Sequence, residues 1–127
     1  MVQAASQVEG EHDFTSFAAV DPERNRERDC SNVRTISYSR WERRAAVDWL
    51  NLGSYPAEQE SYELVYTVRG SGFLHHMVRN LVGLFLLIGK GSFRAEDISR
   101  VLEARSRSTN PGATAPACGL YLVNVEY

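Results

Sequence analysis

The most apolar part of the chain spans residues 70–91 and has glycines at both ends. Hydrophobic side chains recur there every three or four positions, which is the spacing of a helix that buries one face. They are Leu74, Met77, Val78, Leu81, Val82, Phe85 and Ile88, and Leu84, Leu86 and Leu87 fill most of the remaining circumference. About sixteen residues at ~1.5 Å each give a length on the order of 24 Å, enough to cross the face of a sheet. The pattern predicts one long core helix.

Polar residues interrupt this apolar run near its start. His75, His76 and Arg79 lie within it, and its uninterrupted part is far shorter than the ~20 residues of a membrane span, so we expect no membrane segment. Residues four apart share a helix face, which places His75 beside Arg79. The same spacing places His76 beside Asn80. A buried Arg79 needs an anionic partner, because leaving it unpaired would cost about 3–5 kcal/mol. The alternative is an arginine that reaches water from the helix end.

Alternation of side chains predicts three strands. The first, at about 33–43, carries β-branched and aromatic residues, and the second, at 62–69, alternates regularly. The third, at 120–127, closes the chain and places Leu120 and Leu122 on one of its faces. A sheet built from these strands would pack against the core helix.

The remaining segments predict shorter elements and loops. Residues 1–9 have the composition of the last turns of a helix that stops at Gly10. Residues 95–105 form an amphipathic pattern typical of a surface helix. The segment 13–17 is interpreted as a loop anchored by its two phenylalanines, and a direct role for its aspartate stays open. The Ser-, Pro- and Gly-rich segment 106–118, which has arginines at its entrance, predicts an ordered loop close to the functional site.

Two further stretches predict connections at the surface. Residues 21–32 alternate in charge and indicate a solvated loop, in which the arginines could contact phosphates. Residues 44–60 indicate an extended hairpin connection, with a short helical turn at 45–50 as an option. All segments together predict a single α+β domain over residues 1–127, in which an antiparallel or mixed sheet has helices packed on one face.

Composition limits the classes of function. The chain is 43% apolar and 24% charged, with a net charge of −2, so its bulk charge does not indicate a nucleic-acid binder and any RNA contact must rest on a local patch. Thirteen arginines accompany a single lysine, and arginine suits phosphate contacts better than lysine does. Cys30 and Cys118 are far apart and lack metal-ligand spacing, so we expect reduced thiols in a cytoplasmic protein and no metal site. The N-terminus has no signal-peptide pattern.

Three motifs follow one another along the chain. They are His12-Asp13-Phe14-Thr15-Ser16-Phe17, then Phe73 with His75-His76-Met77-Val78-Arg79-Asn80 and Val82-Gly83, and last Ala115-Pro116-Ala117-Cys118-Gly119-Leu120-Tyr121-Leu122 with Val125 and Tyr127. Their order and content resemble the TruA-type tRNA pseudouridine synthases. The resemblance covers most of the chain outside the two surface connections. In that family two related α/β halves flank a cleft that receives RNA, and this chain resembles the C-terminal half.

The resemblance implies an isomerase that acts on the anticodon arm of tRNA. Such enzymes break the N-glycosidic bond of a uridine, rotate the base and rejoin it through carbon, without a metal or organic cofactor. Their essential aspartate lies in an Arg-Thr-Asp-Ala-Gly-type motif of the N-terminal half, and neither this motif nor an upstream tyrosine motif occurs here. None of Asp13, Asp21, Asp29, Asp48 and Asp97 has that context. We therefore expect the chain to be inactive alone.

The resemblance also assigns site residues. Arg79 matches the family arginine that pairs with the absent aspartate, orients its carboxylate and keeps it ionised. The substrate-binding residues expected are Leu120, His75, His76, Phe73 and Asn80. Leu120 matches the apolar residue under the target base, with an ordinary core residue as the alternative. The two histidines are interpreted mainly as packing and hydrogen-bonding residues, with direct RNA contact as the alternative.

Partners follow from the same resemblance. We expect tRNA, the N-terminal half of the same enzyme and a second copy in a homodimer. The composition of residues 1–9 indicates that the sequence starts inside a longer protein. Two other interpretations stay open, namely a non-catalytic RNA-binding or dimerisation module of the same fold and an unrelated α+β interaction domain.

Overall fold

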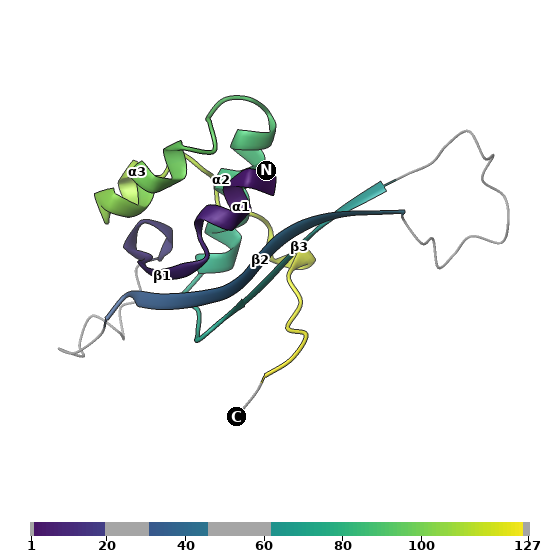
Figure 1. The fold of residues 1–127 in the computed structure, drawn as a ribbon, viewed down its shortest axis with the longest axis horizontal. Helices are drawn as coiled ribbons and strands as arrows, with labels where there is room; N and C mark the ends of the chain where they lie inside the picture. The colour runs from purple at the N-terminus through teal and green to yellow at the C-terminus, as the bar shows by residue number, and fades with distance from the viewer. Residues whose placement is uncertain (1, 20–30, 46–61, 126–127) are drawn as a thin grey trace, which may run out of the picture.

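The computed structural model describes residues 2–19, 31–45 and 62–125 (Figure 1). Its longer elements are α1 (Val2–Gln7), β1 (Gly10–Asp13), β2 (Val33–Ala45), β3 (Tyr62–Gly70), α2 (Met77–Gly89) and α3 (Asp97–Ala104). Short 3-10 turns lie at Thr15–Phe17, Arg107–Thr109 and Ala117–Gly119. The predictions for 21–30 and 46–60 lie outside the described residues.

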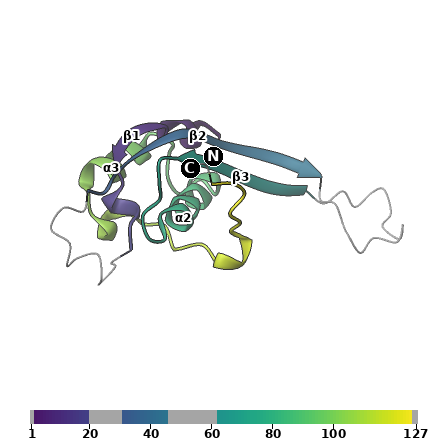
Figure 2. The same ribbon diagram turned by 90° about the horizontal axis from the view of Figure 1, so that it is seen from below.

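The three strands form one antiparallel sheet in the order β1-β2-β3. β2 and β3 pair from Ile36 opposite Gly70 to Ala45 opposite Tyr62, and this two-stranded ribbon projects well beyond the helices in Figures 1 and 2. The helices pack on one face of the sheet, so the α+β prediction is confirmed. No helix among the described residues is both long and apolar enough to span a membrane.

The core lies between this face of the sheet and α2. Phe85 of α2 contacts the rings of Trp41 and Tyr66, with ring centroids 6.1 and 5.1 Å apart. Phe14 and Phe17 are both completely buried, as expected for anchors of the segment 13–17. Burying such a side chain contributes about 1.5–3 kcal/mol. The aromatic residues therefore fix α2 against the sheet and the 3-10 turn against α2.

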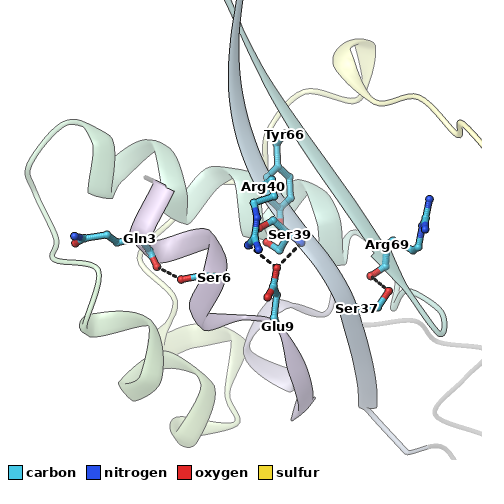
Figure 3. A network of polar contacts seen from close by, with 8 residues as sticks. All are labelled: Gln3, Ser6, Glu9, Ser37, Ser39, Arg40, Tyr66 and Arg69. Atoms are coloured by element: carbon cyan, nitrogen blue, oxygen red, sulfur yellow. Dashed lines mark hydrogen bonds and ion pairs between the residues drawn. The ribbon is translucent and has the colours of Figure 1, made fainter.

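A polar network joins the turn between α1 and β1 to β2 and β3 (Figure 3). Glu9 accepts hydrogen bonds at one carboxylate oxygen from the backbone nitrogen of Ser39, at 3.1 Å, and from Nη1 of Arg40, at 2.6 Å. Buried Ser39 in turn shares a hydrogen bond of 2.6 Å with the hydroxyl of Tyr66. The pairing of β2 with β3 has an irregularity between Ile36 and Tyr38, just before this network. Burial raises the pKa of Tyr66 to about 12.

The strands at 33–43 and 62–69 and the helix at 95–105 are confirmed with small differences at their ends. The helix predicted over residues 1–9 is confirmed as α1, but it ends at Gln7, and Gly10, with a positive φ of 98° that glycine accommodates, is the first residue of β1. β1 was not predicted, because its four residues carry no apolar alternation and its pairing with β2 is a long-range contact.

Two predictions were wrong. The core helix begins at Met77 and not at Leu74, because His76 adopts a left-handed conformation with φ of 57°, which an α-helix cannot contain. The histidines therefore precede the first turn of α2 and do not share faces with Arg79 and Asn80. The final strand is also absent over 120–125, where Tyr121 and Val123 are 79% and 91% exposed. Alternation alone cannot form a strand, because backbone hydrogen bonds to a neighbouring strand are also required.

Tyr66→Phe should remove a pH dependence of stability. The folded-state pKa of about 12 exceeds the ordinary value of 10.0, so the folded protein holds the phenol proton more tightly than the unfolded chain does. This stabilisation is complete below pH 10 and is lost as the pH rises to 12, by about 2–3 kcal/mol. Urea unfolding from pH 8 to 12 should show the difference between the wild type and Tyr66→Phe shrinking by that amount. Tyr121→Phe, at an exposed ring, is the control, and a constant difference would contradict the prediction.

Candidate functional site

The start of α2 is set by the loop that leaves β3. Leu74 is buried, and its carbonyl accepts a hydrogen bond of 3.0 Å from the backbone nitrogen of Met77. His75 accepts one of 2.9 Å from the backbone nitrogen of Ala19, which ties the loop to the N-terminal segment. These two bonds place the histidine pair directly at the N-terminal end of α2.

The two histidines stack on each other. Their ring centroids are 4.0 Å apart with planes inclined by 23°. Partial burial lowers the pKa of His76, and the charges of His75 and Arg79 lower it further. Because the ordinary value is 6.5, a lowered pKa keeps the His76 ring neutral at pH 7. This ring can then accept as well as donate a hydrogen bond.

Arg79 lies in the first turn of α2 and is half-buried. Its Nε donates to the carbonyl of Ala115 at 2.7 Å, and the backbone nitrogen of Ala115 donates to the carbonyl of Arg79 at 3.1 Å. Over residues 2–19, 31–45 and 62–125, no carboxylate lies within ion-pair distance of its guanidinium. The arginine is thus held at Nε, and its two terminal nitrogens remain available to an anion.

Asn80 is completely buried beside Arg79. Its Nδ2 donates to the carbonyl of Phe17 at 2.6 Å. Its Oδ1 accepts from Oγ1 of Thr114 at 2.6 Å and from Nη2 of Arg107 at 3.5 Å. A side chain used in this way exposes no polar atom to a ligand in this structure. Its hydrogen bonds instead join α2 to two loops.

The loop 106–115 lies against α2 at very short range. A Cβ added to Gly83 would come within 1.7 Å of the carbonyl oxygen of Ala113, and one added to Gly112 within 2.6 Å of the backbone nitrogen of Leu84. Only glycine permits this contact on both sides. Arg107 closes the loop by donating to the carbonyls of Asn110, at 3.1 Å, and Gly112, at 3.2 Å. The prediction of an ordered loop close to the site is in line with this geometry.

The residues expected to bind substrate come from three segments and differ in their exposure. His75, His76 and Asn80 surround the start of α2, and Phe73 lies in the preceding loop with 43% of its surface exposed. Leu120 is 50% exposed and follows the turn at 117–119. The histidines, Phe73 and Leu120 all expose surface that a ligand could contact.

Asp13 has a local structural partner. Its Oδ1 accepts hydrogen bonds from the backbone nitrogen and hydroxyl of Thr15, and its Oδ2 lies 3.9 Å from Nε of Arg105. These contacts hold the segment 13–17 and account for this aspartate without a chemical role. Within the part of the chain that the structure describes, no group of three metal-ligating side chains comes together.

Sequence reasoning missed the roles of Thr114 and Ala115. Their partners in α2 lie more than thirty positions away, and no local pattern links the two segments. The only available signal was the composition of 106–118 together with the arginine at position 107.

Arg79 thus lies at the start of the core helix of an α+β domain, with no carboxylate of the described residues paired with its terminal nitrogens. The family model described as tRNA pseudouridine synthase matches residues 4–127. The chain belongs to this family, as its motifs indicated.

Named relatives agree with the family match. The chain is 42% identical over 130 residues to the tRNA pseudouridine synthase A of Solibacter usitatus (strain Ellin6076) and 39% identical over 127 residues to that of Limosilactobacillus reuteri (strain DSM 20016). It is 36% identical over 127 residues to the enzyme of the same name from Aeromonas hydrophila subsp. hydrophila. Each comparison covers the whole chain but only 42%, 42% and 39% of the relative, in that order. The chain thus spans about two fifths of the length of these relatives.

Gly83→Ala should destabilise the chain by at least about 2 kcal/mol, because the new methyl group overlaps the Ala113 carbonyl. On an exposed helix the same change would stabilise by about 1 kcal/mol, since alanine is the better helix former. The sign of the change is therefore diagnostic. Gly119→Ala is the matched control, because nothing lies within 4 Å of its added Cβ. Urea unfolding measures both variants, and an unchanged or raised stability of Gly83→Ala would exclude the close contact.

Proposed function

We propose that this chain is the C-terminal part of an enzyme that converts uridine to pseudouridine in the anticodon arm of tRNA. The observation that carries the proposal is Arg79, which is fixed through Nε while its terminal nitrogens face no carboxylate of the described residues. The family match and the names of the relatives support the reaction class. The chain alone is inactive, and pseudouridine formed by the isolated chain would contradict this.

Arg79 acts on a carboxylate supplied by the N-terminal half of the same enzyme. A guanidinium offers two parallel N–H donors that match a carboxylate, and the pair keeps that carboxylate ionised by lowering its pKa. Because Nε is fixed, the Arg79 guanidinium can turn only slightly. It therefore orients the carboxylate as well as keeping it ionised. An ionised, oriented carboxylate is the form that attacks or stabilises the ribose or base during the isomerisation.

The remaining candidate residues, with the exception of Asn80, contact the RNA. Leu120 offers a flat apolar surface under the flipped base, and its half-exposed side chain is accessible for this. His75, His76 and Phe73 lie before α2 and contact the nucleotides next to the flipped base. Asn80 belongs to the substrate-binding set by sequence, but its burial and the three hydrogen bonds of its side chain support a role inside the protein. No metal or organic cofactor takes part.

The complete enzyme is a cytoplasmic homodimer in this proposal, by analogy with the family that the motifs indicate. The apolar residues exposed over 120–125 support a contact with the N-terminal half, since Tyr121, Leu122 and Val123 form an exposed apolar stretch of the kind that marks a protein interface. The N-terminal half supplies the neighbouring strand whose backbone hydrogen bonds this segment lacks.

A second candidate is a non-catalytic RNA-binding or dimerisation module. Such a module has no use for an arginine presented to a carboxylate, so Arg79→Ala would leave RNA affinity almost unchanged and would reduce stability only by the lost hydrogen bond to Ala115, about 0.5–1.5 kcal/mol.

Arg79→Lys in the complete enzyme should lower turnover by about a hundredfold and RNA affinity by less than about threefold. Lysine keeps the positive charge but cannot reproduce the planar fork that orients the carboxylate. Turnover is measured as pseudouridine formed on an anticodon stem-loop, and affinity as binding of the same RNA.

Arg100→Lys is the matched control for this substitution. Its side chain is 86% exposed on α3, and its one ion pair with the described residues is a long one of 3.8 Å with Asp97, so both quantities should stay at the wild-type level. Equal losses of turnover and affinity in Arg79→Lys would count against the assigned role.

A further inference from the structure

We propose that Thr114, Asn80 and Arg107 are positioning residues, which hold the loop 106–115 on α2 and thereby fix the direction of the Arg79 guanidinium. The inference rests on the proposed function, in which that guanidinium orients a carboxylate. We call the three side chains and the loop they hold the α2 clamp. These three residues do not touch the substrate and affect the reaction only through the position of Arg79.

The clamp reaches Arg79 through Ala115. Two hydrogen bonds connect these residues. Nε of Arg79 donates to the carbonyl of Ala115 at 2.7 Å, and the backbone nitrogen of Ala115 donates to the carbonyl of Arg79 at 3.1 Å. Because Nε lies in the guanidinium plane, its bond to a fixed carbonyl also fixes that plane. The direction of the terminal nitrogens therefore depends on the place of the Ala115 backbone.

Thr114 sets the place of that backbone. It immediately precedes Ala115, and its Oγ1 donates to Oδ1 of Asn80 at 2.6 Å. Asn80 is itself immobile, since it is completely buried and donates to the carbonyl of Phe17 at 2.6 Å. A continuous path of short hydrogen bonds thus runs from the core at Phe17 to the guanidinium of Arg79.

Arg107 holds the other end of the loop. Its Nη2 lies 3.5 Å from Oδ1 of Asn80 and 3.2 Å from the carbonyl oxygen of Gly112. Asn110 donates from its buried amide to the carbonyl of Ser16 and accepts from the backbone nitrogen of Gly112. Together with the contact at Gly83, these bonds leave the loop a single position on α2.

Thr114→Val tests the clamp with the smallest change. Valine has the shape of threonine and removes only the hydroxyl that donates to Asn80, and position 114 is exposed, so the core is not disturbed. Thr114→Ser is the matched control, because serine keeps the hydroxyl. A merely structural hydrogen bond would affect stability in Thr114→Val and leave the catalytic step alone.

Both variants are made in the complete enzyme and assayed on an anticodon stem-loop. Thr114→Val should lower kcat about tenfold with KM within about twofold of the wild type, since displacement of a positioning group by ~1 Å can cost up to ~100-fold in rate. Thr114→Ser should stay within about twofold in both. A kcat of Thr114→Val within twofold of the wild type overturns the proposal, and so does an equal loss in the serine variant.

A readout without catalysis separates this proposal from the proposed function. Hydrogen exchange of the Ala115 amide, which donates to the carbonyl of Arg79, should be about tenfold faster in Thr114→Val than in the wild type and unchanged in Thr114→Ser. Unchanged exchange in Thr114→Val overturns the clamp whatever the activity. A wild-type enzyme that forms no pseudouridine overturns the proposed function instead.

Discussion

The close contact between α2 and the loop 106–115 is the constraint on which the site depends. Gly83 and Gly112 lack the Cβ atoms that would separate the two backbones, so Ala115 comes within hydrogen-bonding distance of Arg79. An arginine in the first turn of a helix faces an unfavourable dipole, and the Ala115 carbonyl compensates part of that cost at Nε. The sheet and the aromatic core matter to the site because they hold α2 in place for this contact.

Much of the fold could be predicted from periodicity. The apolar run of α2, the alternation of β2 and β3 and the amphipathic face of α3 are local patterns, and each formed the expected element. The motif around Arg79 could also be recognised in the sequence, because a charged side chain within an apolar helix needs a partner or a path to water. Local patterns were sufficient where an element's own residues decide its conformation.

The rest depends on contacts between distant segments. The left-handed backbone of His76 shortens α2 by excluding the histidines, and no feature of the sequence around it forces this conformation. Residues 120–125 alternate like a strand but have no strand beside them among the described residues. Asn80 was expected to bind substrate because it follows Arg79 in the motif, whereas its partners Phe17 and Thr114 could be found only in three dimensions.

The central claim is that Arg79 pairs with a carboxylate from outside this chain. A crystal structure of the complete protein tests it most directly. We expect a terminal nitrogen of Arg79 within about 3 Å of a carboxylate oxygen from a segment outside residues 1–127, with Nε still donating to the Ala115 carbonyl. A guanidinium that contacts only solvent, or only residues 1–127, would exclude this pairing.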